Sequence, residues 1–322
     1  MKPKATKELK PITVRPKQWE EIEKEIIELL RREIYAPLMA ELGAPRNRLK
    51  NSETDLLEAI ATGKIHYSRG KLEGKFSAKT SKQIKEMGGK WDAKTRSWKI
   101  GSEKLTPNLK SAIAASESRF NAKIDQINKR LNEVLPEKVA SKFSASQAID
   151  KTIYQTEFDF QSAVKNITVA PKLTDHEIKR LRDEYTQNMQ LYIKDFTEKE
   201  IVSLRKNIIS HVTTGGRYES VIKAIQDSYD VSYNKAKFLA RQETTLLTTK
   251  LAQTRYQSAG INQYRWSCVV GSPNHPVRKM HKALDGKIIS WDNPPIVNEK
   301  GEKKHAGQDY NCRCKSIPIV RF

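Results

Sequence analysis

The residues best suited to chemistry are three cysteines and a histidine near the end of the 322-residue sequence: Cys268, His281, Cys312 and Cys314. Thiolate and imidazole groups are the ligands that zinc prefers, and four of them close a structural site. A small, turn-rich unit with little hydrophobic core gains stability from such a clip. The sequence therefore predicts a zinc site formed by these four side chains.

The spacing of these residues leaves a second interpretation open. Cys312 and Cys314 are separated by one residue, whereas zinc fingers usually separate paired cysteines by at least two. The alternative is that the thiols are free and pack as small hydrophobic groups, with His281 hydrogen-bonded inside the fold. An odd number of cysteines forms no disulfide framework, and this indicates a reducing compartment.

A metal-dependent nuclease is a further hypothesis, suggested by Asn274, His275 and His281. Such enzymes need histidines and acids that converge on an open metal position. The acids near these histidines are Asp285 and Asp292, and a cysteine-rich site would be closed. The sequence contains no phosphate-binding glycine loop and no evident nucleophile triad. We therefore expect a protein that is not an enzyme.

Long helices precede the cysteine-rich region. Thr174 and Glu177 form a capping box that predicts the start of a helix, and Thr197 begins a second such box. Ser232 is read as the cap of a later helix, which ends at Gly260. After Gly260 the residues from 264 to 270 alternate as in a strand. The predicted fold class is α+β, predominantly helical.

Four segments are predicted. Residues 1–50 form a basic, mobile arm (1–17) and an amphipathic helix, and residues 51–106 form a small basic module of the ββαββ type. Residues 107–184 form a helical connector, and residues 185–322 form a turn-rich α+β domain at the end of the chain.

The charge of the chain favours a polyanionic partner. The formal net charge is +21, and residues 61–110 contain thirteen basic and four acidic side chains. Basic groups beside aromatic rings can hold a phosphate backbone and stack bases. The alternative is that Trp91 and Trp98 form the core of the module. The residues predicted to contact nucleic acid are Lys75, Lys79, Lys82, Lys90 and Arg96.

A resemblance to a known family rests on ordered motifs in the last third of the chain. They are an Ala-Arg-x-Glu-Thr run on a helix, a glycine that ends it, and an aromatic-x-Trp strand. A His-x-x-Leu-x-Gly run, a Pro-Pro pair and a closing Asn-Cys-Arg-Cys follow. The matching positions include Arg241, Glu243, Trp266, His281, Gly286, Pro295, Cys312, Arg313 and Cys314. Over roughly residues 185–320 the chain resembles the phage Mu protein F-like head morphogenesis family. The chain departs from the family pattern at two positions: Asn274 stands where the family usually has Asp, and Pro276 stands where it often has Arg. Without these two charged residues, an ion pair at that turn is in doubt.

The resemblance implies a minor head protein of a tailed phage. Such proteins associate with the portal and other head proteins during procapsid assembly, and some aid DNA packaging or ejection. We therefore expect several copies inside the virion head near the portal, beside packaged double-stranded DNA, after assembly in the host cytoplasm. No apolar run approaches the length that spans a bilayer, so no membrane partner is expected. The competing hypothesis is a dedicated DNA-binding protein.

Overall fold

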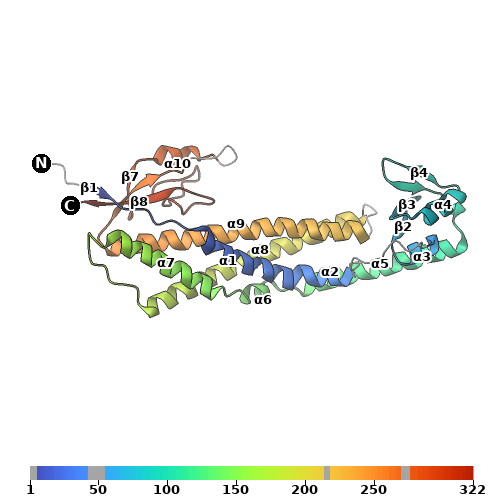
Figure 1. Ribbon diagram of the computed structural model, residues 1–322, viewed down its shortest axis with the longest axis horizontal. Helices are drawn as coiled ribbons and strands as arrows, with labels where there is room; N and C mark the ends of the chain where they lie inside the picture. Colours follow the sequence, from blue (N-terminus) through green and yellow to red (C-terminus); the bar gives the residue numbers. More distant parts are fainter. Residues whose placement is uncertain (1–5, 43–54, 214–217, 270–275, 322) are drawn as a thin grey trace. The chain divides into compact units, whose positions relative to one another are not determined.

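The computed structural model describes residues 6–42, 55–213, 218–269 and 276–321 (Figure 1). The fold is mostly helical α+β with two small four-stranded antiparallel sheets, as predicted. The chain divides into two compact units. Unit 1 comprises Met1–Leu29, Ala140–Lys194 and Tyr233–Phe322, and unit 2 comprises Leu30–Val139 and Asp195–Ser232. Two long helices, α8 (Asp175–Thr213) and α9 (Tyr218–Ser258), each contribute residues to both units.

Unit 1 combines helices with the C-terminal sheet. The helix α1 (Pro16–Leu30) begins in this unit, which also holds α7 (Ser146–Val164). The sheet has the strand order β1-β8-β6-β7, and α10 lies beside it (Figure 1). The bounds of these elements are Thr6–Glu8 for β1, Gln263–Ser267 for β6, Lys279–Leu284 for α10, Ile288–Ser290 for β7 and Lys315–Arg321 for β8.

A buried ion pair joins two helices of unit 1. The guanidinium group of Arg255 on α9 donates to both carboxylate oxygens of Glu157 on α7, at 2.8 and 3.0 Å. The same guanidinium lies 4.6 Å from the ring centre of Phe160. A paired geometry with two hydrogen bonds offsets part of the cost of burying both charges. This contact fixes α9 against α7 just before the chain enters the sheet.

Unit 2 contains the predicted ββαββ module. Its sheet has the order β2-β3-β5-β4, and α4 follows β3 in the chain. Its core consists of aliphatic side chains, among them Leu56, Ile60, Ile65, Leu72 and Ile84, and the start of α5 packs against them. The elements of this unit are η1 (Arg31–Tyr35, a π-helix), α2 (Ala36–Leu42), α3 (Leu56–Ala61), β2 (Ile65–Ser68), β3 (Lys71–Gly74), α4 (Ala78–Glu86), β4 (Lys90–Asp92), β5 (Ser97–Lys99), η2 (Ser102–Lys104) and α5 (Pro107–Glu133). The short helix α6 (Pro136–Ser141) follows α5.

Three predictions about elements were wrong. Thr197 and Ser232 were expected to cap new helices, but α8 and α9 run through both positions without a break. Ser232 is buried, and its hydroxyl bonds to the carboxylate of Glu200 and to the carbonyl of Ser228. Residues 1–17 were expected to be mobile, but Thr6–Glu8 pairs with the last strand of the C-terminal sheet. Ser232 and Thr6–Glu8 are thus placed by partners distant in sequence, whereas Thr197 is simply buried within a continuous helix.

The start of α8 agrees with the sequence. The amide of Glu177 donates to the hydroxyl of Thr174 at 3.3 Å, and the amide of Thr174 donates to the carboxylate of Glu177 at 2.8 Å. This is the reciprocal capping box that the sequence predicts. At the other end of the two-helix stretch, Gly260 has φ of +76°, a conformation that glycine adopts without strain, and the chain turns there into β6.

Candidate metal centre

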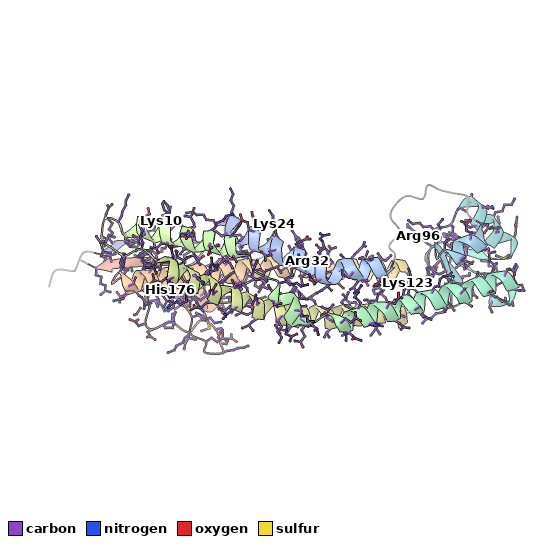
Figure 2. All side chains as sticks on the ribbon, turned by 90° about the horizontal axis from the view of Figure 1, so that it is seen from below. Lys10, Lys24, Arg32, Arg96, Lys123 and His176 are labelled. Carbon is purple, nitrogen blue, oxygen red and sulfur yellow. The ribbon has the colours of Figure 1, made fainter. Side chains whose placement is uncertain are left out.

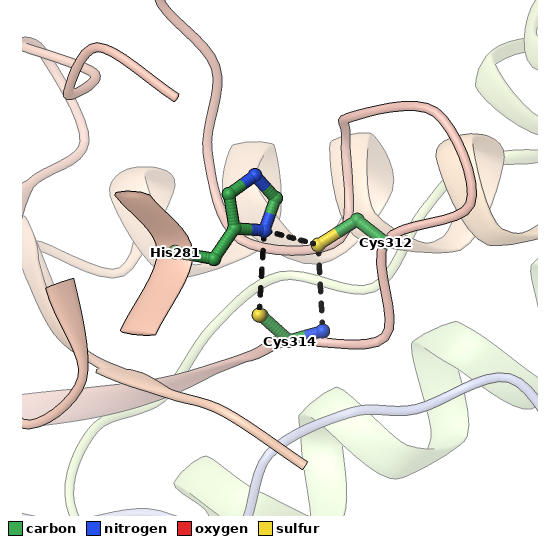
Figure 3. Close-up of side chains that lie close together, drawn as sticks. All are labelled: His281, Cys312 and Cys314. Carbon is green, nitrogen blue, oxygen red and sulfur yellow. Dashed lines mark hydrogen bonds between the residues drawn. The ribbon is translucent and has the colours of Figure 1, made fainter. Parts of the chain in front are cut away.

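The turn-rich end of unit 1 brings a histidine and two cysteines together (Figure 3). His281 lies on α10, and Cys312 and Cys314 lie on the turn that leads into β8. The Nδ1 atom of His281 is 3.5 Å from the Sγ of Cys312 and 3.7 Å from the Sγ of Cys314. All three side chains are buried, and their ligand atoms all lie within 4.8 Å of one another. The sequence predicted these residues from their chemical type alone.

Cys268 lies beside this group. Its Sγ atom is 3.6 Å from the Sγ of Cys314 and 3.2 Å from the carbonyl oxygen of His281. It follows strand β6, which pairs with β8, so the sheet itself carries Cys268 toward Cys314. The structure thus brings all four predicted residues to one place, with three mutually close and Cys268 at the edge.

These distances fit a tetrahedral zinc ion. Zinc binds sulfur at about 2.3 Å and imidazole nitrogen at about 2.0–2.1 Å, which separates neighbouring ligand atoms by about 3.5–3.8 Å. The recorded separations of 3.5, 3.6 and 3.7 Å lie in that range. Of the four predicted ligands, His281, Cys312 and Cys314 have ligand atoms that all lie within 4.8 Å of one another, and Cys268 approaches this group through the Sγ of Cys314.

Asp309 supports the histidine from behind. Its Oδ2 atom is 3.3 Å from the Nε2 of His281, an ion-pair distance at which Nε2 makes no aligned hydrogen bond. Arg278 and Lys304 contact the same carboxylate at 2.9 and 3.0 Å. Carboxylates at this position orient metal-binding histidines and fix their tautomer. Sequence reasoning named Asp285 and Asp292 as the nearby acids and missed Asp309, although it is three residues before Cys312.

The protonation of the group is set by the contacts among its three members. Burial raises the pKa of the Cys312 thiol, but the hydrogen bond from Cys314 outweighs burial and, together with His281, lowers it to about 4. The hydrogen bond to Cys312 raises the pKa of His281. The proton of the pair therefore stays on Cys314, whose pKa is raised. A metal ion would replace the protons that now hold these three groups together.

The nuclease hypothesis gains no support from the described residues. Asp285 accepts a hydrogen bond from the amide of Cys268 at 2.7 Å, and Asp292 accepts one from Gln257 at 3.0 Å. Neither belongs to a group of metal-ligand atoms in the described part of the chain. Asn274 and His275 lie outside the described residues. The sequence put in doubt an ion pair at the turn with Asn274 and Pro276. Near this turn the structure has an ion pair between Arg278 and Asp309.

The other signature residues surround the centre. Trp266 is fully buried on β6, and its ring lies 5.5 Å from that of His281. Gly286 has φ of +76° in the turn between α10 and β7. Pro295 accepts a backbone hydrogen bond from Lys304. Arg241 and Glu243 lie on α9, and burial raises the pKa of Glu243 to about 7.

The basic residues of the ββαββ module are exposed. Lys75, Lys79, Lys82, Lys90 and Arg96 all face solvent, and Figure 2 marks Arg96 on the module. The expectation that both tryptophans are core holds only for Trp98, which packs against the aliphatic cluster. Trp91 is 47% exposed and contacts Phe76 and Trp98 with ring-centre distances of 5.8 and 5.5 Å. The module therefore presents an aromatic ring beside its lysines.

Among the described helices, none combines the length and apolar character that crossing a bilayer requires.

Comparisons with known proteins identify one sequence family and two relatives. Residues 203–317 match the sequence family described as Phage Mu protein F like protein. An uncharacterised protein of Haemophilus influenzae is 28% identical over 166 residues, which are 52% of this chain and 34% of that protein. The NAD(+)–arginine ADP-ribosyltransferase EFV of Enterococcus faecalis is 26% identical over 223 residues, which are 61% of this chain and 42% of that protein. The chain thus spans less than half the length of these relatives, and no solved structure matches it.

The matched region begins within α8, contains all of α9 and ends within β8, so it includes the helix with Arg241 and Glu243 and the whole candidate metal centre. Residues 203–317 therefore resemble the phage Mu protein F-like proteins, a family of phage head morphogenesis proteins.

Proposed function

We propose that this chain is a minor head protein of a tailed phage that associates with the portal during procapsid assembly. The observation that carries the proposal is the Mu F-like domain at residues 203–317, in which His281, Cys312 and Cys314 are close enough to share a metal ion. In this role zinc would tie α10 to the turn that carries Cys312 and Cys314, beside the buried aromatic cluster of Tyr264, Trp266 and Trp291. The protein would be present in several copies inside the head near the portal.

The test is co-sedimentation with portal rings of the same phage. Purified chain is mixed with the rings after nuclease treatment and sedimented at about 0.5 M salt, where screening removes non-specific charge attraction. We expect the chain to sediment with the rings, whereas an unrelated protein of similar net charge stays in the supernatant. Purified procapsids should also contain the chain. Absence from both the ring pellet and the procapsids would refute the assembly role.

Contact with packaged DNA is a second candidate function, and the exposed Trp91, which follows Lys90 in the sequence on a module with exposed lysines, favours it. Stacking of one base on an aromatic ring contributes about 1–3 kcal/mol, and each phosphate contact adds to the salt dependence of binding. The variant Trp91→Ala should therefore weaken binding to a single-stranded oligonucleotide by about fivefold or more. The variant Lys79→Gln with Lys82→Gln should reduce the dependence of affinity on salt.

The control for the DNA test is Lys129→Gln, which removes an exposed charge from α5 outside the module. Equal affinities for the parent, Trp91→Ala and the double lysine variant would exclude the module as a nucleic-acid surface. Binding that persists near physiological salt without any binding to portal rings would favour a dedicated DNA-binding protein instead.

An enzymatic role is tested separately, because one relative is named as an ADP-ribosyltransferase and this chain corresponds to 42% of it. We propose that this chain is structural and expect no release of nicotinamide from NAD. Its incubation with NAD and an arginine-containing protein, followed by chromatography, checks this. Release above that of a heat-denatured sample would contradict the structural role.

A further inference from the structure

A positively charged pocket lies in unit 1 next to the candidate metal centre. Its volume is about 250 Å³, and its walls come from the segment before α1, from α9 and from the turn that leads into β8. Three cationic side chains line it, those of Arg241, Arg313 and Lys315, and no acidic side chain does. The pocket therefore combines three cationic side chains with the sulfur groups of Cys312 and Cys314, and no carboxylate lines it.

The two arginines have no partner of opposite charge. Within the described part of the chain, neither Arg241 nor Arg313 makes an ion pair or a side-chain hydrogen bond, and Arg241 lies 5.7 Å from the ring centre of Trp19. Burial lowers the pKa of Arg241, and the charge of Arg313 lowers it further. Two like charges held together cost free energy, and an anion between them would remove that cost.

A buried hydroxyl in the same pocket also lacks a partner. Thr248 is 2% exposed, and its Oγ1 atom has no hydrogen-bond partner among the described residues. Ser316 also lines the pocket, and its Oγ atom is likewise buried without a hydrogen-bond partner among the described residues. Buried polar atoms are almost always paired in folded proteins, and a ligand with oxygen atoms in this pocket would supply partners for both hydroxyls.

We propose that this pocket binds the phosphate of a small phosphate-bearing molecule, with Arg241 and Arg313 as its charged contacts and Thr248 as a hydroxyl donor. Each guanidinium group offers several N–H donors in a planar fork that matches phosphate oxygens. Arg241, Arg313 and Lys315 together carry three positive charges, more than the single negative charge of a carboxylate can neutralise. A doubly charged phosphate therefore fits the pocket better. The volume is below the roughly 300–1,000 Å³ of pockets for drug-sized ligands, which favours a diphosphate or a nucleotide phosphate.

The pocket is coupled to the metal centre through the chain. Arg313 stands between Cys312 and Cys314, both of which line the pocket, so the fold of the centre sets the position of this arginine. Arg241 is anchored from the other side by α9. A ligand would therefore join the helix to the C-terminal turn, and it would do so at two residues of the family signature.

The test is titration calorimetry of the full chain with diphosphate, ADP and adenosine at about 0.1 M salt. We expect saturable binding of diphosphate and ADP and none of adenosine. Arg241→Gln and Arg313→Gln should each weaken binding by about tenfold or more, as expected for the loss of a charge-assisted contact. Arg321→Gln, which removes an exposed arginine of β8 outside the pocket, should leave binding unchanged.

Circular dichroism and zinc content show whether each variant keeps its fold, and Arg241→Lys, which retains the charge, should bind more strongly than Arg241→Gln. A single-stranded oligonucleotide separates two sources of the phosphate. If it displaces ADP in the parent protein, the ligand is a nucleic-acid phosphate, and if it does not, the ligand is a free nucleotide or diphosphate. Absence of diphosphate binding, or equal binding by the folded glutamine variants, overturns the proposal.

Discussion

At the scale of single residues, the candidate metal centre depends on groups that hold one another in place. His281 contacts both Cys312 and Cys314, and Asp309 stands behind the histidine ring. Because each group contacts at least one other, the removal of one leaves others buried without a partner. The effect on stability should therefore exceed that of deleting an ordinary small side chain.

We predict that Cys314→Ser abolishes stoichiometric zinc binding. The free energy of unfolding should fall by about 4 kcal/mol or more, the range reached when a structural metal is lost. Cys268→Ser is the matched comparison, and it should have a smaller effect because Cys268 lies at the edge of the group. Elemental analysis and urea unfolding measure both. If the purified parent protein contains no zinc, the zinc prediction is wrong and the interpretation that the thiols are free remains.

Glu243 provides a prediction of pH dependence. Burial raises its pKa from 4.5 to about 7, so the folded state binds the proton more tightly than the unfolded state. Its contribution to stability is therefore full below about pH 4.5 and is lost as the pH rises through 7. Glu243→Gln should be more stable than the parent at pH 8, by up to about 3 kcal/mol, and much closer to it at pH 5. Urea unfolding at both values, with the exposed Glu198→Gln as control, measures the difference, and parallel pH profiles would count against it.

At the scale of elements, the continuity of α8 and α9 rests on buried polar contacts in unit 2. Ser232 bonds to Glu200 and lies 2.5 Å from the hydroxyl of Tyr35. The hydroxyl of Thr197 is also buried, but it has no partner among the described residues. The same two residue types that the sequence reads as helix caps thus have opposite energetic roles inside the helices.

We predict that Ser232→Ala lowers the free energy of unfolding by about 1–3 kcal/mol, because it removes the hydroxyl that donates to the buried carboxylate of Glu200. Thr197→Val should be neutral or stabilising, since it replaces an unsatisfied buried hydroxyl with a methyl group of similar shape. Thermal unfolding of the two variants tests this contrast directly. Equal losses would mean that packing, rather than hydrogen bonding, decides both positions.

Sequence patterns predict elements well where the signal is local. The strands and helix of the ββαββ module, and the capping box at Thr174 and Glu177, follow from alternation, turn residues and spacing within a few positions. The predicted helix caps at Thr197 and Ser232 were wrong, because a cap signal depends on a few neighbouring residues. The burial of these two side chains inside α8 and α9 depends on the packing of the helices, which a local signal does not contain. In the metal centre, residue type identified the ligands, but Asp309 was missed because carboxylates are common and only proximity distinguishes this one.

At the scale of the whole molecule, the two units differ in how the chain builds them. The ββαββ module and the start of α5 form one continuous stretch with its own aliphatic core. Unit 1 is assembled from three separated stretches, and its sheet needs residues from both ends of the sequence. The module can be separated from the chain without removing any of its strands, whereas unit 1 cannot.

We predict that a fragment of residues 55–120 folds on its own, although at this length its stability should be marginal. It should show cooperative thermal unfolding by circular dichroism, with Trp98 protected from a fluorescence quencher and Trp91 accessible to it. A fragment of residues 140–194 is the control, and it should show no cooperative transition. If the first fragment is unstructured, the module depends on the remainder of unit 2.

The pairing of β1 with β8 has a consequence for biosynthesis. Thr6 lies opposite Arg321 in the sheet, so β1 is synthesised well before the strand with which it pairs. At about 5–20 residues per second, translation of the intervening chain takes roughly 15–60 s. During that time β1 has no strand to join, and Cys312 and Cys314 do not yet exist. Closure of the sheet in unit 1 must therefore follow the synthesis of β8, which pairs with both β1 and β6.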